Sequence, residues 1–401
     1  MLNNTPFAES EAHEWLKLAK VAHVLGLGVK ASDSIEKAKE KGLTRLDAID
    51  TLILKAVIIK DTGDTSRAAE VTELYEETLK LIDAARVGLS EPGTAEIQES
   101  DLAERFALTI YNRAIHRRYW LRDLAGALAD LDQAAASFGE LGDARMKALA
   151  DCEWVDIQLD WPEQEKDWEE MLKRLIKANE SFDSVGGAAG DSAFCYYQMA
   201  RYFRRKPLSS PDESKTNGVR ARDAYRLAAE QAQLAGDSRQ KEIAEGHVIA
   251  VSWLDLGEIG AAETSERLEK VISVLRTYQG DAWSSRVTRD LLRLRAQALR
   301  ELNEENVLEV YKAAWEAANQ PPLHPAYGAD ARRTARILSE YLEELEKNNG
   351  TLEADRVSVI AKDYIQEWLK HVIDPLERES WIEEVRQYGT GQGDNYGESK
   401  R

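Results

Sequence analysis

Three rows of polar side chains at helical spacing carry the clearest chemistry in this sequence. The first row is Asn112, Arg113, His116 and Arg117; the second is Tyr197, Arg201 and Arg204; the third is Arg286, Arg289, Arg293, Gln297 and Arg300. Steps of three and four residues place the members of a row on one face of a helix. A guanidinium group donates two parallel hydrogen bonds to a carboxylate, so the rows predict a surface that binds an acidic segment of a protein or peptide.

The same rows are also typical of solvated helix faces. In that interpretation, the third row pairs with nearby acids such as Glu301 and Glu304. Exposed ion pairs of this kind are common and contribute at most about 1 kcal/mol each. The opposite side of the third row is apolar and is the predicted core side: Val287, Leu291, Leu294, Ala298 and Leu302.

Residue types that serve catalytic or metal sites are scattered along the chain. The histidines are His13, His23, His116, His247, His324 and His371, with no HExxH motif among them. Cys152 and Cys195 belong to no CxxC pair and are predicted to be buried free thiols. Asp156 and Asp160 beside Trp161 could imitate the carboxylate pair of a sugar-cleaving enzyme, but acids one turn apart are usually the wet face of a helix. We expect no catalytic residue, no metal and no cofactor.

Helical hairpins must position these residues. In the stretch 101–143, two helical patterns meet at Leu121–Arg122, Gly142 ends the second pattern, and Asp143 can cap the next helix. The expected helix pairs are 43–60 with 65–87, 101–119 with 122–139, 143–160 with 163–184, 191–206 with 218–235, 238–257 with 260–279, 282–303 with 305–319, and 326–347 with 352–373. Further helices are expected at 9–26, 33–41 and 375–388. No stretch shows the alternation of a convincing strand.

A Gly-Asp dipeptide marks the rhythm of the hairpins. It occurs at Gly63-Asp64, Gly142-Asp143, Gly190-Asp191, Gly236-Asp237 and Gly280-Asp281. The last four aspartates follow one another at intervals of 48, 46 and 44 residues. A period of this length is typical of helical repeat arrays. Trp253, which precedes a Leu-Gly turn, is predicted to be buried between two hairpins.

The hairpins resemble tetratricopeptide repeats, in which a turn of glycine and an acidic residue precedes a second helix rich in small residues. Residues 63–68 (GDTSRA) and 257–262 (GEIGAA) carry that turn, and residues 122–127 (RDLAGA) carry it without the glycine. The resemblance covers residues 43–373. It implies an all-α fold, a right-handed α-solenoid of about seven antiparallel helix pairs with capping helices at both ends. The repeat is longer than the family's period of about 34 residues.

The sequence is expected to have four parts. Residues 1–42 are expected to form N-terminal capping helices, 43–373 the repeats, 374–388 a C-terminal capping helix, and 389–401 a disordered tail. The stretch 206–218 is expected to be an exposed loop.

The net charge of the chain limits the classes of partner that such an array would bind. The chain carries 72 Asp and Glu against 53 Lys and Arg, a net charge of −19. Phosphate backbones and anionic lipid headgroups are repelled by this excess, so nucleic acid and membrane are not expected partners. The N-terminus lacks a signal-peptide pattern, and the apolar stretch 51–59 is too short to span a bilayer. We therefore expect a cytoplasmic protein.

The expected function is a non-enzymatic scaffold, adaptor or regulator that binds a protein or peptide in the groove of the array. Two alternatives stay open. One is a peptide-sensing regulator that changes its superhelical pitch on binding. The other, from a different class, is a hydrolase in which the hairpins close into an α/α toroid.

Overall fold

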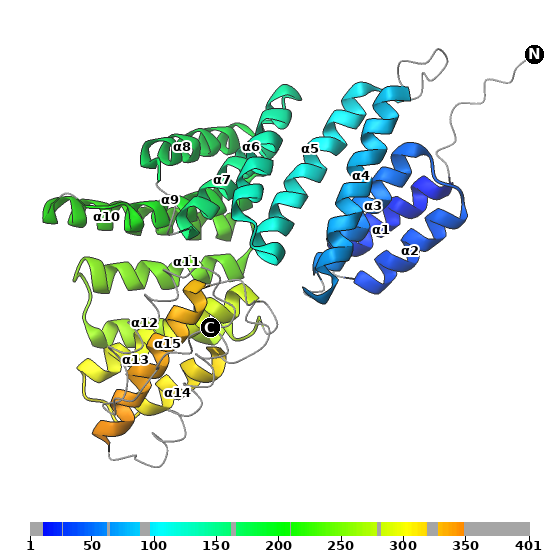
Figure 1. The fold of residues 1–401 in the computed structure, drawn as a ribbon. Helices are drawn as coiled ribbons and strands as arrows, with labels where there is room; N and C mark the ends of the chain where they lie inside the picture. The colour runs from blue at the N-terminus through cyan, green and yellow to red at the C-terminus, as the bar shows by residue number, and fades with distance from the viewer. Residues whose placement is uncertain are drawn as a thin grey trace, which may run out of the picture. The chain divides into compact units, whose positions relative to one another are not determined.

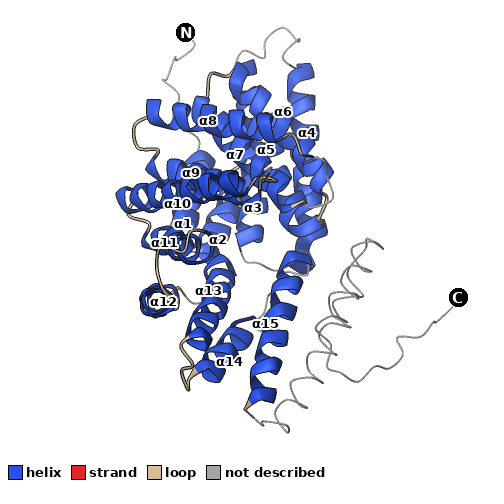
Figure 2. Ribbon diagram, turned by 90° about the vertical axis from the view of Figure 1, so that its left-hand side faces the viewer, coloured by secondary structure: helices blue, strands red, loops and turns tan. Residues whose placement is uncertain are grey.

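The computed structural model describes residues 11–25, 27–61, 65–88, 97–161, 166–208, 210–278, 282–318 and 328–348. Within these ranges all regular structure is helical, and no strand is present (Figure 2). The all-α prediction is therefore confirmed. The expected helices 352–373 and 375–388 and the expected tail 389–401 lie outside the described residues. The chain divides into two compact units, Met1–Gly186 and Gly187–Arg401.

The N-terminal unit is a series of helices that pack against their neighbours in the chain (Figure 1). Its helices are α1 (Glu11–Val24), α2 (Gly28–Glu40), α3 (Arg45–Asp61), α4 (Ala68–Gly88), α5 (Glu99–His116), α6 (Leu124–Glu140), α7 (Ala144–Asp160) and α8 (Trp168–Ser184). Two short turns complete the unit, the 3-10 turn η1 (Thr65–Arg67) and the π turn η2 (Arg117–Leu121). The pairs α1–α2, α3–α4, α5–α6 and α7–α8 each form a hairpin.

The C-terminal unit repeats this arrangement. Its helices are α9 (Ala189–Arg205), α10 (Pro211–Leu234), α11 (Ser238–Ala250), α12 (Ala261–Leu275), α13 (Ala282–Glu301), α14 (Val307–Ala318) and α15 (Gly328–Lys347). The π turn η3 (Val251–Asp255) extends α11. One apolar cluster runs from α9 to α15 and includes Tyr225, Leu268, Leu291 and Tyr311.

The first and second helices of a pair are buried differently. On α8 the buried side chains are Met171, Leu175, Ala178 and Phe182, which lie at steps of four and three on one face. The first helix, α7, packs against both α6 and α8 and buries residues on several sides, polar ones included. First helices therefore carry buried polar groups as well as apolar core.

Gly-Asp turns end and restart helices at two of the predicted positions. Gly142 and Gly236 adopt φ of +74° and +73°, a left-handed conformation that glycine adopts without steric cost. The following residues, Asp143 and Asp237, cap α7 and α11 by accepting hydrogen bonds from backbone N–H groups of their first turns. Gly190 instead lies inside α9, where the preceding turn is made by Gly187 at φ +84°.

The predicted exposed loop at 206–218 is wrong for most of its length. Helix α10 already begins at Pro211, because Ser210 caps it by accepting a 3.2 Å hydrogen bond from the N–H of Glu213. Proline is favoured in the first helical position, and Asp212 and Glu213 complement the positive end of the helix dipole.

The predicted burial of Trp253 is also wrong, since this side chain is only half-buried. It lies in η3, where the wider π turn shifts the phase of the helix, and the neighbouring Leu254 is 51% exposed.

Candidate binding surface

The arginines of the first predicted row join α5 to α6. Arg113 donates from Nε and Nη2 to the two carboxylate oxygens of Asp130, at 2.9 and 2.8 Å. Arg117 Nη1 lies 3.0 Å from the same carboxylate and donates to the carbonyl of Gly126 at 3.2 Å. Asp130 is buried on α6, so the bidentate chemistry expected for a ligand is used within the hairpin.

The other two members of this row also have partners within the chain. Asn112 donates to the carbonyl of Leu108 one turn earlier, at 2.9 Å. His116 is fully buried, with Nε2 3.0 Å from the hydroxyl of Thr72 on α4. That hydroxyl donates its proton to the carbonyl of Ala68, so Nε2 of His116 must be the donor to it. Burial lowers the pKa of His116 to about 4, which keeps the ring neutral at pH 7.

The second row contacts α11 and its π turn. Tyr197 is buried, and its hydroxyl lies 3.0 Å from Nε2 of His247. Arg204 donates from Nε to Asp255 of η3 at 2.9 Å. Arg201 donates to the side-chain carbonyl of Gln198 at 2.7 Å on its own helix.

The third row pairs with α15 rather than with the nearby Glu301 and Glu304. Arg293 Nε lies 3.0 Å from both carboxylate oxygens of Glu340, and Gln297 donates to the same carboxylate at 3.0 Å. Arg300 Nη1 lies 3.6 Å from Glu343.

Two details of the third row correct the prediction. Arg289 is fully buried and donates to Asp290 at 3.0 Å, although the row was expected to be the open side. Helix α13 packs against α11, α12, α14 and α15, so little of its circumference is open. On the predicted core side, Val287, Leu291 and Ala298 are buried but Leu302 is 39% exposed; Arg286 is half-buried.

The structure thus brings most of the predicted arginines to carboxylates of the chain itself. The first row lies in one unit and the other two rows lie in the other unit. That these residues bind an acidic partner stays a prediction.

A charged cluster around Arg118 was not predicted from the sequence. The π turn η2 directs this arginine, only 4% exposed, toward three acids of α7. Its Nη1 donates to Glu153 at 2.9 Å, and its Nη2 contacts Asp156 and lies 3.1 Å from Asp160. The spacing of these acids, at i, i+3 and i+7, was the available signal. Asp156 and Asp160 both pair with the guanidinium group of Arg118. They therefore do not form an open carboxylate pair like that of a sugar-cleaving enzyme.

A second cation approaches this cluster from the end of α3. Loss of hydration lowers the pKa of Lys60 to about 8, while the negative charge of Glu153 opposes that shift. Burial raises the pKa of Glu153 to about 7, although Arg118 and Lys60 favour its ionised form. Three carboxylates therefore face two cations in a poorly hydrated place.

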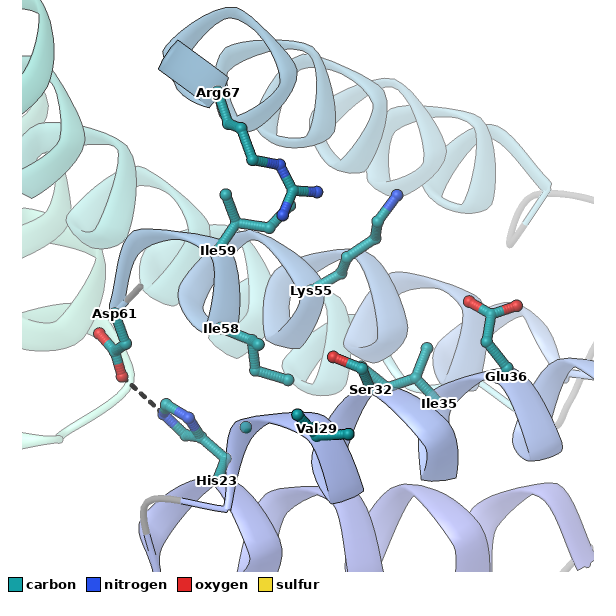
Figure 3. Close-up of a pocket in the computed structure, with 11 residues that line it drawn as sticks. His23, Val29, Ser32, Ile35, Glu36, Lys55, Ile58, Ile59, Asp61 and Arg67 are labelled. Atoms are coloured by element: carbon teal, nitrogen blue, oxygen red, sulfur yellow. Dashed lines mark ion pairs between the residues drawn. The ribbon is translucent and has the colours of Figure 1, made fainter. Parts of the chain in front are cut away.

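A groove crosses the exposed face of α3, between α2 and η1 (Figure 3). It encloses about 480 Å³ and is named here the α3 groove. The residues lining it are His23, Gly28, Val29, Ser32, Ile35, Glu36, Lys55, Ile58, Ile59, Asp61 and Arg67. Ile35, Ile58 and Ile59 form a buried apolar floor, and His23 lies 3.5 Å from Asp61 at one end. On α3, the positions Lys55, Ile58 and Ile59 share one face of the helix.

A solved structure assigns the fold. The crystal structure of the apo form of RapI aligns with a TM-score of 0.52 and 11% sequence identity, over 94% of this chain and 96% of that chain. The chain has a tetratricopeptide-like helical repeat fold. At this identity the likeness shows the fold alone.

Two other solved structures align with lower scores. The apo form of the quorum sensor NprR from B. thuringiensis gives a TM-score of 0.31 at 13% identity, over 88% of this chain and 97% of that chain. The human IFIT1 dimer with PPP-AAAA gives a TM-score of 0.39 at 12% sequence identity, over 95% of this chain and 84% of that chain. Scores below 0.5 add nothing to the tetratricopeptide-like assignment. No family model matches the chain, and no curated protein matches it.

The described residues also bear on metal sites and on membrane spans. Within the described ranges, no group of three His, Cys, Asp or Glu side chains is arranged to hold a metal ion. Among the helices listed above, none is both long and apolar enough to cross a membrane.

Proposed function

We propose that this protein is a non-enzymatic, tetratricopeptide-like binding module that holds a segment of a partner protein or peptide in the α3 groove. The observation that supports the proposal is the groove itself, with its apolar floor and charged rims. Sites that bind small molecules are concave, mostly apolar, and contain a few polar groups that orient the ligand. A volume of about 480 Å³ falls in the range of such sites.

The exposed apolar surface of the groove lies at its edge rather than on its floor. Ile35 and Ile59 are almost completely buried, whereas Val29 at the edge is 79% exposed. A partner side chain placed over this edge would remove apolar surface from water on both molecules, at about 25 cal/mol for each Å².

The arginine rows support the proposal less well. An acidic segment would have to displace Asp130, Asp255 or Glu340 from the arginines that already bind them. Each carboxylate of the partner that pairs with an arginine would leave one carboxylate of the chain without its arginine. The exchange therefore adds little net affinity.

The class of partner and the location of the protein are parts of the same proposal. A net charge of −19 favours a protein partner over a nucleic acid, because phosphates are repelled. The buried free thiols Cys152 and Cys195 suit the reducing cytoplasm. Asp156 and Asp160 are held by Arg118, which supports a role in binding rather than in hydrolysis.

Random peptides displayed on phage test the proposal without knowledge of the partner. We expect the full-length protein to enrich a set of peptides. Val29→Gln should weaken their binding roughly tenfold, because it removes an apolar contact without adding charge. The matched control is Leu234→Gln, which alters a 75% exposed leucine of α10 in the other unit. Equal binding by Val29→Gln and wild type would reject the groove as the site.

A further inference from the structure

Two cations on the rim of the α3 groove share a single carboxylate. Arg67 donates from Nε to Glu70 at 2.8 Å, and Lys55 Nζ lies 3.3 Å from the other oxygen of the same carboxylate. Both cations are well exposed, at 40% for Arg67 and 37% for Lys55. Hydrogen bonding to Arg67 lowers the pKa of Glu70, so this acid is ionised and cancels only one of the two positive charges.

The other charged groups along the groove have counterparts of their own. Glu36 lies 2.8 Å from Lys39. Asp61 lies 3.5 Å from His23, which is a cation only when protonated, and the negative charge of Asp61 also favours the protonated form of Lys60. The local excess of positive charge is therefore at Lys55 and Arg67, between η1 and α3, where Figure 3 shows both side chains beside Ile59. This rim differs in sign from the chain as a whole, whose net charge is −19.

One apolar side chain of the groove lining is well exposed on the α2 side. Val29 is 79% exposed, and Val24 and Leu25, which are 82% and 66% exposed, precede it in the turn that joins α1 to α2. Exposed apolar residues that gather beside a groove, rather than lying singly, are typical of binding surfaces. The groove thus offers an exposed apolar side chain, Val29, at its α2 edge and positive charge at the rim formed by Lys55 and Arg67.

The helices around the α3 groove determine which secondary structure of a partner segment fits into it. Within the described residues there is no strand, so the α3 groove borders no sheet edge to which a peptide strand could be added. A groove between helices accepts an amphipathic helix, whose apolar residues at i, i+3, i+4 and i+7 interlock with the ridges of α3.

Building on the proposed function, we propose that the α3 groove binds an amphipathic α-helix of a partner protein. The apolar face of this helix lies on Ile58, Ile59 and Val29, and an acidic side chain at its edge pairs with Lys55 and Arg67. One or two acids suffice, because a longer acidic tract would be repelled by the net charge of the chain.

A charge-swap experiment tests this assignment. A phage library of helical peptides, with apolar residues fixed at i, i+3, i+4 and i+7 and the other positions random, is selected on the full-length protein. Selected peptides should carry Asp or Glu at one edge. One such peptide and its Glu→Lys version are then titrated against wild type and Lys55→Glu by fluorescence anisotropy.

Wild type should prefer the acidic peptide roughly fivefold, as an exposed ion pair allows. Lys55→Glu should reverse this preference and restore binding of the lysine peptide. The matched control, Lys270→Glu, changes a 71% exposed lysine of α12 and should leave the preference unchanged. Circular dichroism checks that each variant is folded.

Each failure has a distinct meaning. If peptides bind and Val29→Gln weakens them, but Lys55→Glu leaves the preference for acid intact, the acidic helix is rejected and the groove is retained. If no peptide from either library binds the folded protein, the proposed function and this inference are both rejected.

Discussion

Arg118 holds the carboxylates of Glu153, Asp156 and Asp160 in a place with little water. Buried charges are stable only when their partners remain, and removal of one partner commonly costs about 3–5 kcal/mol. Burial raises the pKa of Glu153 to about 7, so the ionised form of this carboxyl is disfavoured in the folded protein.

Glu153 therefore makes stability depend on pH. Its pKa is about 7 in the folded protein and about 4.5 in the unfolded chain. Between these values the folded state retains a proton that the unfolded state has lost, so the contribution of Glu153 to stability falls as pH rises from about 4.5 to about 7. Glu153→Gln removes this pH-dependent loss of stability. The free energy of unfolding of the variant, minus that of wild type, should therefore increase by roughly 1–3 kcal/mol from pH 5 to pH 8, measured by urea unfolding.

The control for this measurement is Glu180→Gln, at an exposed position of α8. The difference between this variant and wild type should be the same at both pH values. If Glu153→Gln and wild type also differ equally at pH 5 and pH 8, burial does not raise the pKa of Glu153.

The individual arginines show what the spacing of residues in the sequence can predict. The spacing correctly predicted that Arg113, Arg204 and Arg293 lie on helices. It did not find their partners, because Glu340 is 47 residues from Arg293 and Asp255 is 51 residues from Arg204. The α3 groove was missed for a similar reason. Its floor combines residues of α2 and α3, and the stretch 51–59 alone shows only that it is apolar.

At the scale of helices, the sequence predicted those helix ends at which a single residue type determines the backbone conformation. Gly142 and Gly236 need positive φ, and the aspartates after them cap the next helix. The π turns could not be predicted in this way. Arg122 adopts φ +58° after η2 without being glycine, so its residue type gives no signal for this conformation.

The start of α10 gives a test at this scale. Ser210 accepts the N–H of Glu213, so Ser210→Ala should destabilise the protein by about 1 kcal/mol in urea unfolding. Hydrogen exchange should show protected amides over 215–218 in wild type. The comparison variant is Ser181→Ala, inside α8, where the hydroxyl only bonds back to Lys177; it should change stability by less than about 0.5 kcal/mol. Rapid exchange over 215–218 would favour the loop that sequence analysis expected.

The whole chain carries a large excess of negative charge, and this excess opposes folding. The net charge is −19, so many carboxylates have no cation to balance them. Repulsion among them is stronger in the compact state than in the expanded unfolded chain. Salt also weakens exposed ion pairs such as Lys270–Glu266, but each contributes at most about 1 kcal/mol. Buried groups such as the Arg118 cluster are screened much less.

Moderate salt should therefore stabilise the protein. Raising sodium chloride from 10 to 150 mM shortens the screening length from about 30 to about 8 Å, which removes repulsion between distant acids but not between touching groups. A relief of about 1 kcal/mol would raise Tm by roughly 2 °C in a chain of this size, measurable by differential scanning calorimetry. Potassium chloride at equal ionic strength should give the same rise, since screening does not depend on the cation. A fall in Tm over this range would mean that the ion pairs within the helical array outweigh its net charge.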